Sequence, residues 1–403
     1  MDLQYVEHKH NWPDGLAREQ ELLSMEEAER ALAFHRTFPE YRETPLQSLK
    51  NLAAFLGVRD IWVKDESFRF GLNAFKVLGG SYAIGQYLAK KAGRPIEELG
   101  CMELIRMAQE GEPLTFVTAT DGNHGRGVAW TAKRLGLKSV VYMPKGSAPE
   151  RLQNIRAEGA EASITELNYD DAVRLANRRA AENGWIMVQD TAWAGYEDIP
   201  TWIMQGYATM ACEAYRQLQN ERPTHIFIQA GVGSLAGAVV GFFANRYREN
   251  KPVMAVVEPD QAACIYETMR ADDGKRHCVD GEMKTIMAGL ACGEPNTISL
   301  PILEKNAEFY LSCGDSVAAD GMRILGNPLR GDERVISGES GAAGFGAAMR
   351  ILTDPSLLSL KQKMGIDENS RLLFFSSEGD TDAENYRRIV WDGAFHRKKG
   401  FEC

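Results

Sequence analysis

The 403-residue sequence predicts an α/β protein of two domains, each with a mostly parallel, twisted sheet flanked by helices. Short, continuous apolar runs alternate with helical stretches along the chain, which is the pattern of parallel strands buried on both faces. The length also exceeds that of a usual single domain. About half of the apolar runs precede Asp190 and half follow it. Two such domains leave a cleft at the carboxyl ends of their strands, where ligands bind.

The individual elements follow from local composition. The expected strands are residues 60–64, 114–120, 139–143, 161–165, 185–188, 225–230, 253–258 and 371–376. Helices are expected over 125–135 and 170–183, between these runs. The first forty residues are expected to form a helical lead-in, because Ser24 and Glu27 have the spacing of a capping box.

Composition and charge indicate which classes of partner and which cell compartment the sequence favours. A net charge of -10 argues against a nucleic-acid partner, since phosphate backbones require clustered positive charge. The polar N-terminus has no apolar core of a signal peptide, and no run is long enough to span a membrane. Seven cysteines without a CxxC pair predict reduced thiols rather than a metal site or a disulfide framework, with one isolated disulfide left open. We therefore expect a cytoplasmic protein.

Lys76 stands among apolar neighbours, between a loop and a helix. Desolvation lowers the pKa of such a lysine, and a neutral amine is what Schiff-base chemistry requires. The alternative is an ordinary surface lysine whose stem covers apolar surface. The position therefore makes Lys76 a candidate nucleophile.

The glycine-rich segment 230–237 directly follows an apolar strand and opens a helix. Backbone amides and a helix N-terminus together suit a phosphate group. The segment is no Walker loop, and it misses the dinucleotide pattern because position 236 is Ala. A purely structural turn is the alternative.

Two further polar segments follow strands. Residues 120–127 combine a carboxylate, an amide side chain and an imidazole in one loop, which is denser than a turn needs. Residues 376–382 continue an apolar run into a polar cluster that begins with Ser376 and Ser377. Both segments are expected in the cleft, with plain polar turns as the alternative.

The order of these motifs resembles the fold-type II pyridoxal 5′-phosphate (PLP) enzymes, the family of tryptophan synthase β, threonine dehydratase and cysteine synthase, over residues 40–390. Within that family the chain looks most like the diaminopropionate ammonia-lyases. The strings that carry this likeness are residues 64–67, 69–76, 120–127, 189–193, 287–295, 337–341 and 377–382. Serine and threonine dehydratases usually carry Ser where this chain has Asp121.

The resemblance implies a cofactor site. Lys76 would form the Schiff base with PLP, and Asn123 would bind its 3′-hydroxyl. Ser376, or Ser377 in the alternative register, would face the pyridine nitrogen, and Glu339 would lie near the ring. The residues that would hold the phosphate are Gly231, Val232, Gly233, Ser234 and Leu235. No metal is implied. The larger, PLP-binding domain would comprise residues 1–82 and 200–403, and residues 83–199 would close over the substrate.

The resemblance also implies the reaction: elimination of D- and L-2,3-diaminopropionate to pyruvate and two ammonia by a homodimer. The freed Lys76 amine would be the base on one face of the substrate, and Asp121 on the other. Asp190 would bind the positive β-amine or assist Asp121, because carboxylates attract a cationic substrate. The remaining expected substrate contacts are Thr120, Gly122 and His124.

Alternative functions remain open on the sequence alone. Another PLP-dependent eliminase, such as a serine or threonine dehydratase, would release one ammonia per pyruvate. A non-catalytic regulatory protein that binds PLP or another phosphate ligand would not require the lysine. A nucleotide-binding enzyme is disfavoured by the missing Walker and dinucleotide patterns.

Overall fold

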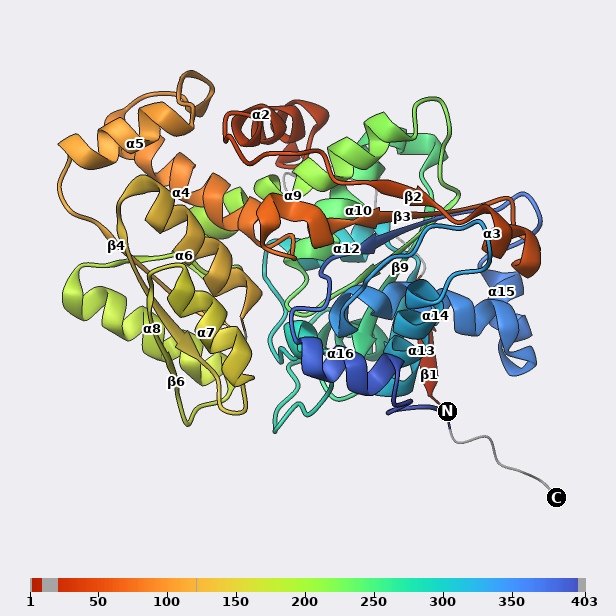
Figure 1. The fold of residues 1–403 in the computed structure, drawn as a ribbon. Coiled ribbons are helices and arrows are strands. Elements are labelled where there is room, and N and C mark those ends of the chain that lie inside the picture. Colours follow the sequence, from red (N-terminus) through yellow and green to blue (C-terminus); the bar gives the residue numbers. More distant parts are fainter. Residues whose placement is uncertain (1, 9–20, 121, 398–403) are drawn as a thin grey trace.

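The computed structural model describes residues 2–8, 21–120 and 122–397 (Figure 1). It contains a seven-stranded sheet in the order β1-β10-β9-β8-β11-β3-β2 and a four-stranded sheet in the order β6-β5-β4-β7. Helices lie against both sheets (Figure 1). The predicted α/β class with mostly parallel sheets is therefore confirmed.

The larger sheet has a parallel centre and antiparallel edges. Its strands are β1 (Leu3–Glu7), β2 (Leu46–Ser48), β3 (Asp60–Asp65), β8 (His225–Gln229), β9 (Val253–Pro259), β10 (Phe309–Cys313) and β11 (Arg371–Ser376). In the central register Phe374 of β11 pairs with Val63 on one side and Phe227 on the other. Strands β1 and β2 run antiparallel to their neighbours and close the two edges.

The helical lead-in predicted for the N-terminus is wrong for residues 3–7, which form β1 along β10. Part of that lead-in, residues 9–20, lies outside the described residues. Its helix does form over α2 (Met25–His35), where the Ser24 side chain accepts a hydrogen bond from the Glu27 backbone N–H as the capping spacing predicts. Strands β2 and β10 were not predicted either.

The smaller sheet is parallel throughout and consists of β4 (Thr115–Ala119), β5 (Lys138–Met143), β6 (Glu161–Ile164) and β7 (Ile186–Met187). Helices α6 (Asn123–Leu135), α7 (Pro149–Ala157) and α8 (Tyr169–Asn183) pack against it. All four strands were predicted, and β7 is shorter than the expected run because only two of its residues pair with β4.

The remaining α-helices belong to the larger sheet or connect the two. They are α3 (Lys50–Leu56), α4 (Val77–Ala92), α5 (Cys101–Glu110), α9 (Asp198–Gln217), α10 (Ser234–Tyr247), α11 (Cys264–Ala271), α12 (Ser299–Asn306), α13 (Asp315–Gly326), α14 (Glu339–Thr353), α15 (Leu358–Lys363) and α16 (Ala383–Val390). The predicted domain limits at residues 82 and 199 fall inside α4 and α9, and this division stays a prediction. Within the described ranges no helix combines the length and the apolarity that crossing a bilayer requires.

Helices α4 and α9 approach each other through glycines. A Cβ atom on Gly79 would lie 2.5 Å from Cε1 of Tyr207, and one on Gly206 would collide with the carbonyl oxygen of Leu78. Any larger residue at either place would therefore push the helices apart. The start of α4 is thus fixed directly against α9.

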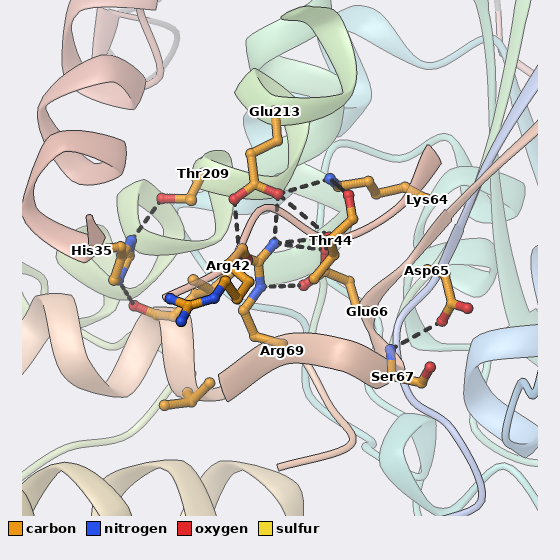
Figure 2. A network of polar contacts seen from close by, with 12 residues as sticks. His35, Arg42, Thr44, Lys64, Asp65, Glu66, Ser67, Arg69, Thr209 and Glu213 are labelled. Carbon is orange, nitrogen blue, oxygen red and sulfur yellow. Dashed lines mark hydrogen bonds and ion pairs between the residues drawn. The ribbon is translucent and has the colours of Figure 1, made fainter. Parts of the chain in front are cut away.

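A buried ionic network connects the end of β3 to α9 (Figure 2). Arg69 Nε lies 2.8 Å from Glu66 Oε2, and Arg69 Nη2 lies 2.7 Å from Glu213 Oε2. Lys64 Nζ lies 2.7 Å from the same Glu213 oxygen. All four side chains are fully buried. Two cations against two carboxylates leave no net charge, which makes this burial tolerable.

The residues that follow Arg69 are also held in place, by hydrogen bonds to another segment of the chain. Phe70 (φ 50°) and Asn73 (φ 60°) adopt left-handed backbone conformations in the turn that leads to α4. Asn73 Nδ2 donates to Asp380 Oδ1 at 3.0 Å, and its carbonyl accepts from the Gly379 N–H at 3.0 Å. The turn is thereby anchored to the segment that follows β11.

We expect Glu213→Ala to lower the free energy of unfolding by about 3–5 kcal/mol, because it leaves two buried cations with one carboxylate. Urea denaturation would measure this. Glu26→Ala is the matched control: its carboxylate, paired with Arg30 at 3.3 Å, is 82% exposed, and its loss should change stability by about 0.5 kcal/mol or less. Equal effects of the two changes would contradict the assignment.

Candidate active site

A cavity of about 830 Å³ opens where the strands of both sheets end. The segments that follow β4, β7, β8 and β11 all contribute to its wall. Its volume lies in the range of small-molecule sites, which are typically about 300–1,000 Å³. This is the cleft that the alternating pattern predicted.

Lys76 lies in this wall, between the anchored turn and the first residue of α4, as the sequence predicted. Its ammonium forms an ion pair with Asp190 Oδ2. Nζ also lies 5.7 Å from the ring centroid of Phe75 and 5.9 Å from that of Tyr207. The side chain is 20% exposed, so the amine is reachable from the cavity while its stem is covered.

Asp190 is buried and charged. Burial raises the pKa of its carboxyl, but the Lys76 ammonium and the His124 ring outweigh burial and hold the pKa at about 2. The Tyr169 hydroxyl donates to Oδ1 at 3.3 Å. The backbone carbonyl of Asp190 accepts from Asn296 Nδ2 at 2.9 Å. The carboxylate is therefore fixed from both sheets.

The glycine-rich segment lies between β8 and α10, as predicted, and Gly231, Val232, Gly233, Ser234 and Leu235 all line the cavity. A Cβ atom on Gly231 would come within 3.1 Å of Leu290 Cα. Gly233 has φ 103°, which favours glycine. The N-terminus of α10, at Ser234, is part of this wall, and the amides of a helix N-terminus suit a phosphate.

The polar loop after β4 contributes Thr120, Asn123 and His124 to the wall, whereas Gly122 donates its N–H to Thr120 Oγ1 at 3.0 Å and does not line the cavity. His124 is buried, and its Nε2 lies 2.8 Å from the Val188 carbonyl oxygen, which orients the ring. Asp121 lies outside the described residues.

The end of β11 distinguishes the two serines. Ser377 lines the cavity, and its hydroxyl accepts from Gln229 Nε2 at 2.9 Å. Ser376 is absent from the described wall and donates to Ser337 Oγ at 2.8 Å. Of the two serines it is therefore Ser377, the alternative register, that belongs to the cavity wall.

Carboxylates gather beside Ser377. Glu339 lines the cavity at the start of α14, and burial, together with the neighbouring Glu378, raises its pKa to about 7. Glu378 also lines the cavity and accepts a hydrogen bond from Asn123 Nδ2. Glu378 and Tyr169 were missed by the sequence analysis. The first stood directly after Ser377 in a string already singled out.

The residues of the cavity fit PLP. A lysine amine and a glycine-lined helix N-terminus share one cavity, and these are the two features that an aldehyde and a phosphate on one ring would require. Polar side chains occupy the wall between them. Within the described ranges, no three His, Cys, Asp or Glu side chains form a cluster suited to a metal ion.

Known proteins are similar to this chain in sequence and in fold. The model of the family "Pyridoxal-phosphate dependent enzyme" matches residues 37–362. The diaminopropionate ammonia-lyase of Salmonella typhimurium is 53% identical over 378 residues, which cover 92% of this chain and 94% of the relative. The enzyme of Escherichia coli K12 is 51% identical, over 92% and 93% of the two chains.

Solved structures of a related enzyme have the same fold as this chain. The crystal structure of Escherichia coli diaminopropionate ammonia lyase in complex with D-serine superimposes with a TM-score of 0.91 at 47% identity, over 98% of both chains. The same enzyme in complex with an aminoacrylate-PLP azomethine reaction intermediate gives 0.90, also at 47% identity and 98% of both chains.

Threonine deaminase isoform 2 from Solanum lycopersicum, at 20% identity over 96% of each chain and a TM-score of 0.71, shares the fold. The family model spans most of the chain, and two curated relatives are more than half identical over nearly their whole length. The chain therefore belongs to the pyridoxal-phosphate dependent enzymes of fold-type II and, within them, to the diaminopropionate ammonia-lyases.

Proposed function

We propose that this enzyme converts 2,3-diaminopropionate, in its D and L forms, to pyruvate and two ammonia: the β-amino group leaves by α,β-elimination, and the α-amino group is released by hydrolysis of the product. The observation that carries the proposal is the buried Asp190 carboxylate paired with Lys76 inside a cavity that fits PLP. The diaminopropionate ammonia-lyase relatives support the substrate. Bound PLP supplies the electron sink that makes the α-proton of an amino acid acidic.

The residues that would hold PLP follow from the cavity wall. Lys76 would carry it, and the backbone amides of residues 231–235 would bind its phosphate. Asn123 would turn its amide from Glu378 toward the ring hydroxyl. Ser377, which lines the cavity, would lie at the pyridine nitrogen, with Glu339 beside the ring. A neutral hydroxyl there leaves that nitrogen largely unprotonated.

Asp190 would recognise the second amino group of the substrate. With a pKa of about 2 its carboxylate is charged at neutral pH, so it attracts a positive β-amine that serine lacks. The Lys76 amine would take the α-proton on one face. Asp121 would take it on the other, which would admit both enantiomers. Thr120, Gly122 and His124 would complete the substrate site.

We also propose that the enzyme acts in the cytoplasm as a homodimer. The six cysteines within the described ranges are all free thiols, which fits a reducing compartment. The homodimer rests on the resemblance to the PLP-enzyme family. Size-exclusion chromatography with light scattering measures the oligomeric state.

Lys76→Ala should abolish the PLP absorption band that borohydride removes from the native enzyme, and should lower pyruvate formation by about a thousandfold or more. Lys91→Ala, at a 45% exposed lysine of the same helix, is the control and should change neither. The native enzyme should release two ammonia per pyruvate from diaminopropionate. Faster turnover of serine, with one ammonia per pyruvate, would make the enzyme a dehydratase instead.

Asp121→Asn should reduce kcat for D-diaminopropionate by about tenfold or more beyond its effect on the L-form, because it removes a base from one face only. Asp190→Asn should weaken the binding of both enantiomers, since the β-amine is common to them. Pyruvate detection with each enantiomer measures the difference. Equal losses in Asp121→Asn would refute the two-base mechanism.

The buried Glu339 should make stability depend on pH. Its pKa is raised from 4.5 to about 7, so its contribution is complete below pH 4.5 and is lost as the pH rises through 7. Between about pH 5 and pH 8, Glu339→Gln should therefore lose less unfolding free energy than the native enzyme, by roughly 2–3 kcal/mol. Urea denaturation at saturating PLP measures it. Glu112→Gln, at an 86% exposed carboxylate, should behave like the native enzyme.

A further inference from the structure

Tyr207 carries a buried hydroxyl group, and a contribution to stability does not explain why it is there. The residue is fully buried on α9, and its hydroxyl has no hydrogen-bond partner among the described residues. An unsatisfied buried hydroxyl destabilises a fold, and most buried polar groups are satisfied. Phenylalanine would fill the same space without that cost.

Tyr207 lies next to Lys76 in the fold. Its ring centroid lies 4.6 Å from that of Phe75, the residue before Lys76, and 5.9 Å from Lys76 Nζ. Room for the ring exists because residue 79 is glycine: a Cβ atom there would lie 2.9 Å from Cζ, the carbon that bears the hydroxyl. Three features of the packing therefore place the phenol beside the start of α4.

The phenol stays neutral in this place. Burial raises its pKa well above the ordinary value, and the Lys76 ammonium only partly opposes that rise. A neutral phenol oxygen can accept a hydrogen bond from an amine N–H. It is therefore suited to hold an amine and not to act as a base itself.

In this structure the Lys76 ammonium is bound by Asp190. If Asp190 binds the substrate β-amine, as proposed above, Lys76 loses that partner while the substrate is present. A further hydrogen-bond acceptor beside a largely buried amine stabilises it at that moment. The Tyr207 hydroxyl is a buried acceptor on the adjacent helix that makes no hydrogen bond of ordinary geometry among the described residues, and Lys76 lies close enough to it to lower its pKa.

We propose that Tyr207 is a positioning residue for this enzyme: its hydroxyl accepts a hydrogen bond from Lys76 Nζ whenever the amine is bonded to neither Asp190 nor the cofactor. It thereby keeps the amine near the substrate α-carbon and ready to rejoin PLP. The inference rests on the proposed role of Lys76 and adds to it a second state of that side chain.

Tyr207→Phe tests this, because it removes one oxygen that bonds to nothing among the described residues. Tyr310→Phe is the matched control: Tyr310 on β10 is also fully buried with an unpartnered hydroxyl, and it does not line the cavity. For both variants, kcat and KM for D- and L-diaminopropionate, the thermal midpoint, and the rate at which the cofactor-free protein captures added PLP would be measured.

Tyr207→Phe should lower kcat by roughly tenfold to a hundredfold with KM nearly unchanged, and should slow PLP capture. Its thermal midpoint should stay equal or rise. Tyr310→Phe should leave kcat and PLP capture unchanged, with the same or a higher midpoint. These results together would support the inference.

Native-like kcat and PLP capture in Tyr207→Phe would overturn it. A lower kcat accompanied by a clearly lower thermal midpoint would also overturn it, since the hydroxyl would then be structural. Failure of the proposed function is distinguishable, because Lys76→Ala would in that case retain the PLP band and turnover whatever Tyr207→Phe does.

Discussion

The double ion pair of Arg69 is the contact on which the active site depends. One guanidinium bridges Glu66, directly after β3, and Glu213, near the C-terminal end of α9, with every partner fully buried (Figure 2). Charges in such a place are tolerable only when each is matched, so the backbone around them has little freedom. The chain that leaves Arg69 enters the turn before Lys76 and starts α4. An error in this network would therefore displace the lysine.

Helix α9 carries that constraint to the cavity. The same helix supplies Glu213 to the network, Gly206 to the contact with the Leu78 carbonyl, and Tyr207 to the surroundings of Lys76. Its Thr209 lies 2.8 Å from His35 Nδ1 and so joins α2 to the same assembly. Because all of these groups share one rigid element, the position of the Lys76 amine is set by packing in the core, which suits its proposed role of meeting a cofactor at a defined angle.

Much of the fold and part of the site could be predicted from sequence. Continuous apolar runs located every strand of the smaller sheet, because strands buried on both faces leave a strong local signal. Strands β1 and β2 gave no such signal: they lie at sheet edges, where burial is partial. For the site, the sequence predicted the position of Lys76 before a helix. It could not decide which of Ser376 and Ser377 lines the cavity, because that depends on where β11 ends, and side chains one residue apart in a strand point to opposite faces of the sheet. Tyr169 reaches Asp190 only through the tertiary fold, so no local pattern could identify it.

The site also shows how an acidic chain can bind anions. The net charge is -10, and the cavity wall itself contains Asp190, Glu339 and Glu378. A phosphate placed at residues 231–235 would meet backbone amides and a helix N-terminus, whose positive potential is local and independent of the net charge. Ser234 of that segment donates to the backbone carbonyl of Asp190, whereas the Asp190 carboxylate pairs with the amine of Lys76. Backbone amides for a phosphate and carboxylates for an amine, both in one cavity wall, suit an anionic cofactor together with a cationic amine. If Asp190 also binds the substrate amine, as proposed above, that amine and the amine of Lys76 compete for one carboxylate, and a second, neutral acceptor for Lys76 then has a use.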